Sequence, residues 1–234
     1  MAEKNQFDVI IVGGSYSGLA AGMALGRALR KVLIIDSGKP CNRQTPHSHN
    51  FITQDGKTPK EIAASARAQV EQYKTVQFLN GTVSGGVKNE HGFEISTEKG
   101  EKFSAKKLIF ATGISDIMPP IPGFAECWGI SVLHCPYCHG YEVRNKKTGI
   151  IGNGDAGFEF VTMISNWTKD LALYTNGKST LTEEQTKKLQ QHNITIIETE
   201  IKEFSHDKGI LQNIILKDGS KAPIEGLYVR CPFA

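Results

Sequence analysis

Two long segments of this 234-residue chain share one plan: an apolar strand, a glycine-rich turn, a helix and a second apolar strand. The first reads FDVIIVGGSYSGLAAGMALGRALRKVLIIDSGK, and its run at 9–12 is apolar throughout, as in a parallel strand covered on both faces. The second reads KKTGIIGNGDAGFEFVTMISNWTKDLALYTNGKS. Because strand–helix–strand units build parallel sheets, the two segments predict an α/β chain with two such domains.

The first turn follows the G-x-G-x-x-G spacing through Gly13, Ser15 and Gly18, with serine at the second glycine position. A glycine there normally lets the backbone approach a pyrophosphate, and the serine hydroxyl could instead hydrogen-bond the phosphate. Asp36 closes the second strand about 20 residues beyond the turn, where a carboxylate can accept hydrogen bonds from ribose hydroxyls. Together these residues predict a Rossmann-like dinucleotide-binding unit.

The second turn carries the intact fingerprint at Gly152, Gly154 and Gly157. Helix amides and the helix dipole at such a turn favour a bound pyrophosphate. The following strand is predicted at Leu171 to Tyr174 and ends in LYTNGK, which offers neither an acid for a free 2′-hydroxyl nor an arginine pair for a 2′-phosphate. Asn176 and Lys178 could serve a phosphate weakly, so the sequence leans slightly to NADPH and leaves NADH possible.

The chain between the two segments also shows patterns that predict its secondary structure. TPKEIAASARAQVEQYK predicts a helix, and the alternating residues from VQFLNG to IFATG predict an antiparallel meander whose last strand is Lys107 to Ala111. The proline-rich ISDIMPPIPGF is a stiff connector, which places a domain boundary near Asp116. We therefore predict two three-layer domains, each with a parallel sheet and an antiparallel meander: 1–116 for the first nucleotide, 117–228 for the second, and 229–234 as the start of a crossover back.

Composition narrows the class of protein. The chain is globular by composition, with 39% hydrophobic and 22% charged residues. Its net charge is +3 and its basic residues are scattered, so no basic surface for nucleic acid or anionic lipid is predicted. No secretory leader or membrane-spanning run is evident, so a cytoplasmic location is predicted. In a reducing cytosol, the close pair Cys135 and Cys138 is expected to bind metal or to be redox-active.

The segment VLHCPYCHGYEV allows three chemistries: c-type haem attachment, a glutaredoxin-type dithiol or a zinc site. Haem is disfavoured by the cytoplasmic context and the lack of an evident axial ligand. Zinc is disfavoured because His134 and His139 directly adjoin the cysteines and are poorly placed to complete a tetrahedron. A C-x-x-C with its second cysteine in the first helical turn places both thiolates near the positive end of the helix dipole and within bonding distance. His139, with an ordinary pKa near ~6.5, suits proton transfer to or from a thiol.

The chain resembles the low-molecular-weight thioredoxin reductase family of flavoproteins. The resemblance is carried by VIIVGGSYSGL with Asp36, IFATG before the connector, CPYCHG and GIIGNGDAG, in the same order and spacing along nearly the whole chain. It implies FAD at the first turn, a nicotinamide cofactor at the second, and a redox-active disulfide in the nicotinamide domain. It further implies that Cys138 faces the flavin, that Cys135 meets an external thioredoxin-like protein or small dithiol or disulfide, and that the protein is a homodimer. The glutaredoxin interpretation is therefore excluded. A glutaredoxin dithiol should begin the first helix of a small domain, whereas this pair lies between the proline-rich connector and the second Rossmann-like segment.

His139 stands where thioredoxin reductases usually have aspartate, and CHGYE resembles a C-x-x-C-H-G branch that includes dithiol oxidases of disulfide-containing natural products. A thioredoxin-reductase-like flavin disulfide oxidoreductase is therefore favoured. An FAD-dependent dithiol oxidase that uses oxygen is the leading alternative. A non-catalytic redox-sensing nucleotide-binding protein is the other alternative, and bound flavin would distinguish it because a sensor needs none.

The resemblance adds two FAD contacts, Gln44 and Asn50, from the loop NRQTPHSHNFITQDG. The predicted cofactor-binding residues of the first domain are Gly13, Gly14, Ser15, Ser17, Gly18, Asp36, Ser37, Lys39, Gln44, Asn50, Val83, Ala111, Thr112 and Gly113. Those of the second domain are Gly152, Asn153, Gly154, Asp155, Ala156, Asn176 and Lys178. The predicted catalytic residues are Cys135, Cys138 and His139, and no metal site is predicted. Cys41, Cys127 and Cys231 are expected to be small apolar fillers.

The family continues after the nicotinamide domain into a segment that completes the FAD domain, whereas this sequence stops at LYVRCPFA. We expect an FAD site that lacks one wall. We also expect an open sheet edge and an exposed apolar face where that segment belongs.

Overall fold

A computed structural model describes residues 5–234 of the chain. The chain forms two compact units, each considered by itself below. Unit 1 contains the described residues up to Arg43 together with Lys57–Ile114, and unit 2 contains Gln44–Gly56 and Ser115–Ala234. The boundary predicted near Asp116 is close to this division, but the segment Gln44–Gly56, inside the predicted range 1–116, packs with unit 2.

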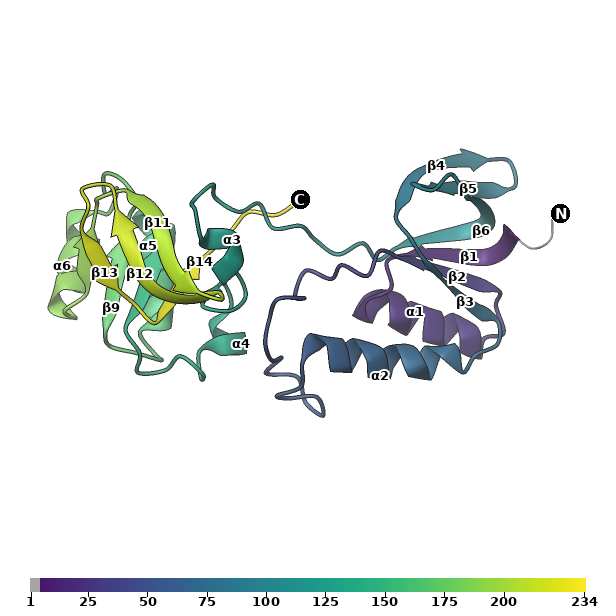
Figure 1. The fold of residues 1–234 in the computed structure, drawn as a ribbon, viewed down its shortest axis with the longest axis horizontal. Helices are drawn as coiled ribbons and strands as arrows, with labels where there is room; N and C mark the ends of the chain where they lie inside the picture. Colours follow the sequence, from purple (N-terminus) through teal and green to yellow (C-terminus); the bar gives the residue numbers. More distant parts are fainter. Residues whose placement is uncertain (1–4) are drawn as a thin grey trace. The chain divides into compact units, whose positions relative to one another are not determined.

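Unit 1 is built on a six-stranded sheet in the order β3-β2-β1-β6-β5-β4, with α1 and α2 on one face (Figure 1). Strands β1, β2, β3 and the second part of β6 are parallel, while β4, β5 and the start of β6 form an antiparallel meander. The elements are β1 Gln6–Val12, α1 Tyr16–Arg27, β2 Val32–Asp36, α2 Pro59–Glu71, β3 Val76–Asn80, β4 Val83–Asn89, β5 Gly92–Thr97 and β6 Lys102–Phe110.

The apolar runs of unit 1 are continuous because the parallel strands are buried on both faces. In β2 every residue from Val32 to Ile35 is buried. One core lies between the sheet and the helices α1 and α2, and the other lies between the opposite face and the meander, around Ile10, Leu33 and Ile95. This three-layer arrangement holds the carboxyl ends of β1, β2 and β6 at one edge of the sheet.

Helix α2 begins with a capping box. The Thr58 hydroxyl accepts a hydrogen bond from the Glu61 amide at 3.2 Å, and the Glu61 carboxylate accepts one from the Thr58 amide at 2.8 Å. Pro59 occupies the first helical turn, where its missing N–H costs nothing. The helix predicted from TPKEIAASARAQVEQYK is therefore present and begins at the proline.

Unit 2 has a five-stranded parallel sheet in the order β10-β9-β8-β14-β7 and a separate antiparallel sheet β11-β12-β13. One core packs α5 and α6 against the parallel sheet, and a second core packs the antiparallel sheet against its other face (Figure 1). The elements are α3 Phe124–Cys127, β7 Val132–Leu133, α4 Pro136–His139, β8 Thr148–Ile151, α5 Gly154–Ile164, β9 Leu171–Tyr174, α6 Glu183–Gln191, β10 Thr195–Ile197, β11 Ile201–Asp207, β12 Ile210–Leu216, β13 Lys221–Pro223 and β14 Gly226–Val229.

The predicted fold class, two Rossmann-like units that each combine a parallel sheet with an antiparallel meander, is confirmed. The last strand of the first meander is longer than predicted, because β6 serves both the meander and the parallel sheet. After β14 the chain runs antiparallel to the connector, with Ser115 and Ala234 exchanging backbone hydrogen bonds at 2.9 and 3.0 Å. Within residues 5–234, no helix has the length and apolar character that a bilayer crossing requires.

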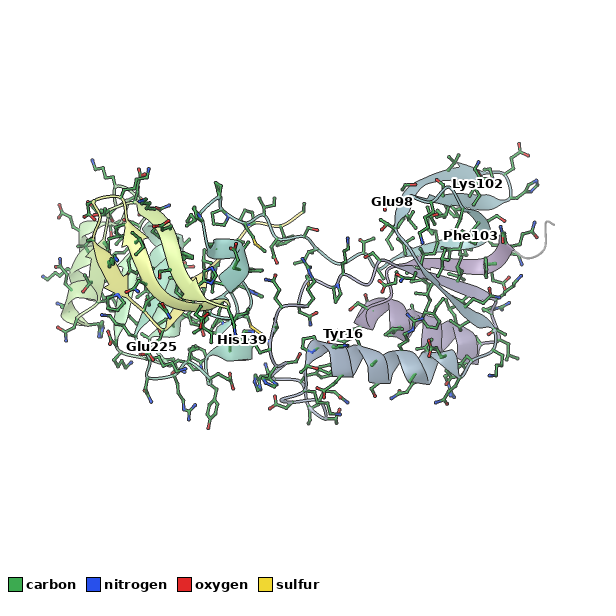
Figure 2. The ribbon with its side chains drawn as sticks, in the orientation of Figure 1. Tyr16, Glu98, Lys102, Phe103, His139 and Glu225 are labelled. Atoms are coloured by element: carbon green, nitrogen blue, oxygen red, sulfur yellow. A yellow bond between two sulfur atoms is a disulfide. The ribbon has the colours of Figure 1, made fainter. Side chains whose placement is uncertain are left out.

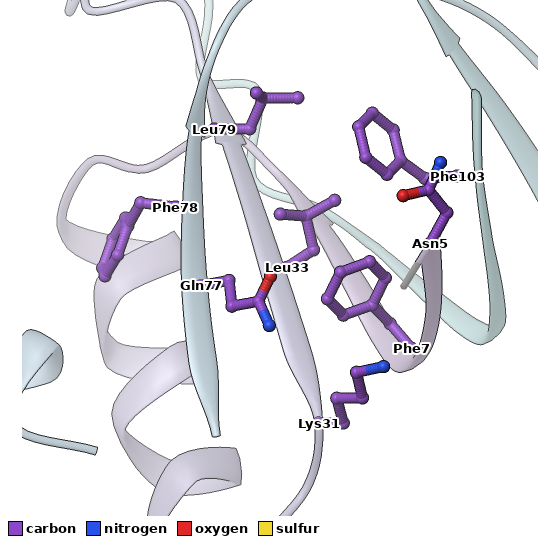
Figure 3. A pocket seen from close by; sticks show the side chains of 8 residues that line it. All are labelled: Asn5, Phe7, Lys31, Leu33, Gln77, Phe78, Leu79 and Phe103. Carbon is purple, nitrogen blue, oxygen red and sulfur yellow. The ribbon is translucent and has the colours of Figure 1, made fainter. Parts of the chain in front are cut away.

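An open edge and an apolar hollow are present in unit 1. Strand β5 pairs with β6 only as far as Ala105, so the described part of β6 from Lys107 onward has a partner on one side, and Phe110 is 71% exposed. Figure 3 shows a hollow on the sheet face away from the helices, lined by Phe7, Leu33 and Phe103, among others. Its lining residues Phe7 and Lys31 lie at the amino ends of β1 and β2, opposite to the strand ends where dinucleotides bind in such sheets.

Candidate functional site

The first glycine turn joins β1 to α1 and leaves no room for a side chain at Gly13 or Gly18. Gly13 has a φ of +102°, and a Cβ on it would lie 2.1 Å from the Ala111 carbonyl oxygen. A Cβ on Gly18 would lie 1.9 Å from the Gly13 carbonyl oxygen. Ser15 is the N-cap of α1 and its side chain makes no capping hydrogen bond, so the amides at this helix end are not satisfied by a side-chain cap. The geometry fits a pyrophosphate, which such amides bind.

Asp36 is fixed beside this turn at the end of β2. Its carboxylate accepts hydrogen bonds from the Gly14 amide at 3.0 Å and from the Gly38 amide at 3.2 Å. A Cβ on Gly14 would lie 2.8 Å from the Asp36 Cβ, so the turn and the carboxylate are in direct contact. The two amide bonds orient the carboxylate, and its remaining lone pairs are available to ribose hydroxyls.

The other residues predicted to contact the first nucleotide divide into two groups. Ser17, Ser37 and Lys39 are exposed near the turn and the end of β2, Val83 begins β4, and Ala111, Thr112 and Gly113 follow β6 beside Gly13. Gln44 and Asn50 lie in unit 2: the Gln44 side chain donates to the Ala125 carbonyl at 3.1 Å, and the Asn50 amide donates to Asp55 at 2.8 Å. Their role toward FAD stays a prediction.

The second turn joins β8 to α5. A Cβ on Gly152 would lie 2.9 Å from the Gly157 Cα, which explains why both positions are glycine. Asn153 is the N-cap of α5, and its side-chain oxygen accepts from the Gly154 amide at 2.9 Å. The same oxygen accepts from the Thr180 amide at 2.8 Å, and the side-chain nitrogen donates to the Lys178 carbonyl at 2.9 Å. Asn153 therefore ties the turn to the loop that follows β9.

The remaining residues predicted at the second turn lie around it in unit 2. Asp155 and Ala156 are exposed in the first turn of α5, and Asp155 accepts from the Gln185 side chain of α6 at 2.7 Å. Asn176 has a φ of +50°, and its side-chain oxygen accepts from the Ile201 amide at 2.7 Å. Lys178 is exposed in the same loop. The structure thus gives Asp155 and Asn176 bracing bonds of their own.

Cys135 and Cys138 are joined by a disulfide, with their Cα atoms 5.3 Å apart. Cys135 is the N-cap of the short helix α4 and Cys138 is inside it, and both sulfur-bearing residues are partly exposed. Gly140 closes the motif because a Cβ there would lie 2.4 Å from the Pro136 carbonyl oxygen and 2.6 Å from the Trp167 indole nitrogen. Tyr137 packs its ring edge-on against Trp167 at 5.5 Å and remains 66% exposed. The disulfide is therefore presented on a rigid support with an aromatic side chain beside it.

His139 ends α4 next to Cys138 (Figure 2). Burial lowers the pKa of His139 below its ordinary 6.5, His134 and His49 lower this pKa further, and Glu142 opposes them. Its imidazole is therefore neutral at neutral pH and able to accept a proton from a thiol. Among the described residues, no three His, Cys, Asp or Glu side chains are arranged to hold a metal ion.

Two residues near His139, His49 and Glu142, are not among the site residues predicted from the sequence. His49, in the segment packed on unit 2, lies between two carboxylates, with Asp55 at 3.5 Å from its Nδ1 and Glu142 at 3.6 Å from its Nε2. About 90 residues separate His49 from α4 along the chain, and no local pattern brings them together. The HSHN stretch was the only signal, and a polar loop with two histidines is common on protein surfaces.

The other cysteines differ in their surroundings. Cys127 is fully buried and Cys231 is partly buried, and burial raises the pKa of each thiol to about 11. Both therefore stay protonated, and Cys127 fits the expected role of an apolar filler. Cys41 is exposed, so that expectation is wrong for Cys41: its place in the loop after β2 leaves it in solvent.

We expect the change His49→Asn to raise the pKa of His139. When protonated, His49 is a positive charge that disfavours a second charge on His139, and it also holds Glu142, which favours that charge. Both effects of removing His49 therefore raise the pKa of His139. NMR titration of the imidazole signals measures the shift.

The matched control is His192→Asn, at an exposed helix end in the same unit. A lower or unchanged pKa of His139 in the His49→Asn chain would contradict the assignment.

The lowered pKa of His139 also predicts how the stability of the folded chain changes with pH. Because the folded chain binds this proton less readily than the unfolded chain, His139 costs stability as the pH falls from about 6.5 to its lower folded pKa. We therefore expect the His139→Asn chain to lose less folding stability than the unaltered chain over this pH range, as measured by thermal unfolding at several pH values.

The fold and these sites define a chain with two Rossmann-like units, a glycine-rich turn in each and a C-x-x-C disulfide. Residues 7–231 match the profile of the pyridine nucleotide-disulphide oxidoreductase family, and the chain belongs to that family. It is 35% identical over 189 residues to a thioredoxin reductase of Claviceps purpurea, covering 77% of this chain and 59% of that protein. It is 32% identical over 224 residues to a thioredoxin reductase of Aspergillus oryzae, covering 92% of this chain and 71% of that protein.

Solved structures give the same result. A crystal structure of an oxidoreductase from Agrobacterium tumefaciens is 36% identical, with a TM-score of 0.89 over 97% of this chain and 76% of that one. A crystal structure described as the thioredoxin reductase TrxB of Bacillus anthracis is 31% identical, with a TM-score of 0.93 over 97% of this chain and 77% of that one. The chain spans about three fifths of the Claviceps protein. Family membership implies FAD and a pyridine nucleotide in general terms, and the two glycine turns fit such groups.

Proposed function

We propose that the chain is a thioredoxin-reductase-like flavoprotein disulfide oxidoreductase that passes electrons between NAD(P)H, FAD, the Cys135–Cys138 disulfide and an external dithiol or disulfide. The single observation that carries the proposal is the partly exposed disulfide at α4, next to a histidine whose pKa is lowered, in a chain with two dinucleotide turns. A buried structural disulfide would need neither the exposure nor the histidine.

Thiol–disulfide exchange at this pair balances without other reactants. A substrate thiolate attacks the Cys135 sulfur, a mixed disulfide forms and the Cys138 sulfur leaves as a thiolate. The second substrate thiolate then attacks the substrate sulfur of the mixed disulfide and releases the Cys135 thiolate. The substrate loses two electrons and the cysteine pair gains them, and the reverse sequence reduces a substrate disulfide. His139 accepts the proton of the entering thiol or returns one to a leaving thiolate.

The proposal divides the cofactors between the two units. FAD would lie on Gly13–Gly18 and Asp36 in unit 1, and a nicotinamide dinucleotide, for which the sequence leans slightly to NADPH, would lie on Gly152–Gly157 in unit 2. When bound, these groups supply hydride and two-electron transfer that a cysteine pair alone cannot perform. The protein residues contribute amide groups for the pyrophosphates and a carboxylate for the first ribose.

The partner follows from the exposed cysteines. A thioredoxin-like protein or a small molecule with two thiols or a disulfide could reach Cys135, because both cysteines are partly exposed and Tyr137 beside them is largely exposed. A homodimer, which the family resemblance implies, and a cytoplasmic location, predicted from the sequence, are part of the same proposal. The substrate is therefore proposed as a class and not as a single compound.

The visible absorption spectrum tests the proposal directly. We expect purified protein to show bound oxidised flavin that bleaches when a nicotinamide dinucleotide is added without oxygen, and two thiols to appear at Cys135 and Cys138. A colourless protein that takes up no added FAD would overturn the flavoprotein proposal and leave a sensing role. Thiol labelling with mass spectrometry identifies the cysteines that were reduced.

A dithiol oxidase is the second candidate, and it is favoured by a histidine at position 139, where thioredoxin reductases usually have aspartate. A neutral imidazole beside the disulfide can take a proton from an entering substrate dithiol, which is the first event in the oxidising direction. In that case the flavin stays oxidised with nicotinamide dinucleotide and bleaches only when a small dithiol is added without oxygen. Admission of oxygen should then restore the spectrum.

A further inference from the structure

The loop that follows β9, residues 175–181, borders the second glycine turn. Asn153 in that turn accepts hydrogen bonds from the Thr180 amide at 2.8 Å and the Thr180 hydroxyl at 3.1 Å, and it donates to the Lys178 carbonyl at 2.9 Å. In Rossmann-like units the end of this strand meets the adenosine ribose, and its side chains distinguish a 2′-hydroxyl from a 2′-phosphate. The loop 175–181 is therefore the segment that would contact the 2′ position.

A carboxylate is attached to this loop from the neighbouring strand. Glu198 follows β10 directly, and its side-chain oxygen accepts a hydrogen bond from the Ser179 amide at 2.9 Å. Its backbone carbonyl accepts from the Gly177 amide at 2.8 Å, so both main chain and side chain hold it against the loop. A single amide bond leaves the carboxylate with further lone pairs to accept hydrogen bonds.

Opposing positive charge in the loop is small. Lys178 is the only basic residue in 175–181. Lys178 and Glu198 are both exposed, and the Glu198 carboxylate is held against the loop by the Ser179 amide. A 2′-phosphate adds about 1.5 to 2 negative charges, which repel a carboxylate in the same loop. A ribose 2′-hydroxyl can instead donate a hydrogen bond to that carboxylate. The residues at this position fit the hydroxyl and do not fit the phosphate.

We infer that the second dinucleotide site takes a nucleotide with a free 2′-hydroxyl and rejects one with a 2′-phosphate, and that Glu198 determines this specificity. The inference rests on the proposed nicotinamide site and replaces the slight lean of the sequence to NADPH. The sequence pattern could not show it, because Glu198 lies more than 20 residues beyond the end of β9, where the ribose acceptor is usually sought.

Isothermal titration of the full chain with ADP-ribose and with 2′-phospho-ADP-ribose tests the inference without any redox reaction. We expect the unaltered chain to bind ADP-ribose at least about tenfold more tightly, a difference of about 1.4 kcal/mol. Glu198→Gln keeps an oxygen for the Ser179 amide and removes the charge, so the ratio of the two dissociation constants should fall toward one. The fall should come mainly from tighter binding of the 2′-phosphate.

Glu200→Gln is the matched control, because Glu200 is two residues away, is exposed and pairs with the Lys217 side chain instead of the loop. Its ratio should equal that of the unaltered chain. Tighter binding of the 2′-phosphate by the unaltered chain, or a ratio that Glu198→Gln leaves unchanged, overturns the inference while the nicotinamide proposal stands. If neither compound binds, the inference falls together with the nicotinamide part of the proposed function, and the cysteine chemistry is judged separately by thiol labelling.

Discussion

Replacing Cys138 by serine should abolish catalytic exchange between the chain and a dithiol substrate. We expect the rate to fall by at least about 10³-fold, because Cys135 and Cys138 act as a unit. The internal disulfide cannot form, since serine offers no sulfur to Cys135 at the 5.3 Å Cα separation. Cys135 remains as a single thiol at the amino end of α4. An added disulfide probe should then form a stable mixed disulfide on Cys135, because no neighbouring thiol releases it.

Intact-mass spectrometry after reaction with the probe measures this trapped species. Cys41→Ser is the control, since Cys41 is an exposed cysteine of the same chain with no disulfide partner among the described residues. The unaltered chain, after reduction, should consume the probe and return to the internal disulfide. Turnover by the Cys138→Ser chain at the unaltered rate would show that the exchange occurs elsewhere.

Replacing Gly18 by alanine should weaken FAD binding by about 100-fold or more, equivalent to about 2.7 kcal/mol. A Cβ at this position would lie 1.9 Å from the Gly13 carbonyl oxygen and 2.9 Å from its carbonyl carbon, both of them backbone atoms. The turn must open to remove the clash, which moves the α1 amides away from a pyrophosphate. Overpacking of this kind also costs about 1–3 kcal/mol of folding stability.

Titration of FAD followed by flavin fluorescence measures the affinity, and circular dichroism during heating separates lost binding from lost folding. Gly81→Ala is the matched control in the same unit, because a Cβ there meets no atom within 4 Å and no left-handed φ is required. It should bind FAD as the unaltered chain does. A Gly18→Ala chain that folds and retains full affinity would place FAD away from this turn.

Several elements could be predicted from the sequence because their causes are local. The glycine turns, the strand ending at Asp36 and the strand Leu171–Tyr174 each depend on residues close together in the chain. The pairing of Cys135 with Cys138 also needs only four consecutive residues at the start of a helix. In these segments the hydrophobic pattern and the turn residues indicate the same structure, so the elements can be predicted from sequence.

Other predictions were limited because they depended on assembly. Gln44 and Asn50 were assigned to a flavin loop by resemblance, yet their hydrogen bonds in the structure are to Ala125 and Asp55 of unit 2. Strand β6 was predicted too short, because its first residues pair with the antiparallel β5 while its later residues pair only with the parallel β1. A single strand that takes part in both antiparallel and parallel pairing shows no single hydrophobic period.

The sequence by itself determined the two strand–turn–helix–strand segments, the acid beside the first turn and the cysteine pair, since each is set by residues within a few dozen positions of one another. Only the tertiary structure placed His49 near His139, by packing the segment Gln44–Gly56 on unit 2, and Glu198 on the loop after β9, by pairing β9 with β10. Both depend on long-range packing, whose partners no local pattern specifies. The proposed proton chemistry at the disulfide and the inferred choice of nucleotide therefore depend on neighbours that only the folded chain reveals.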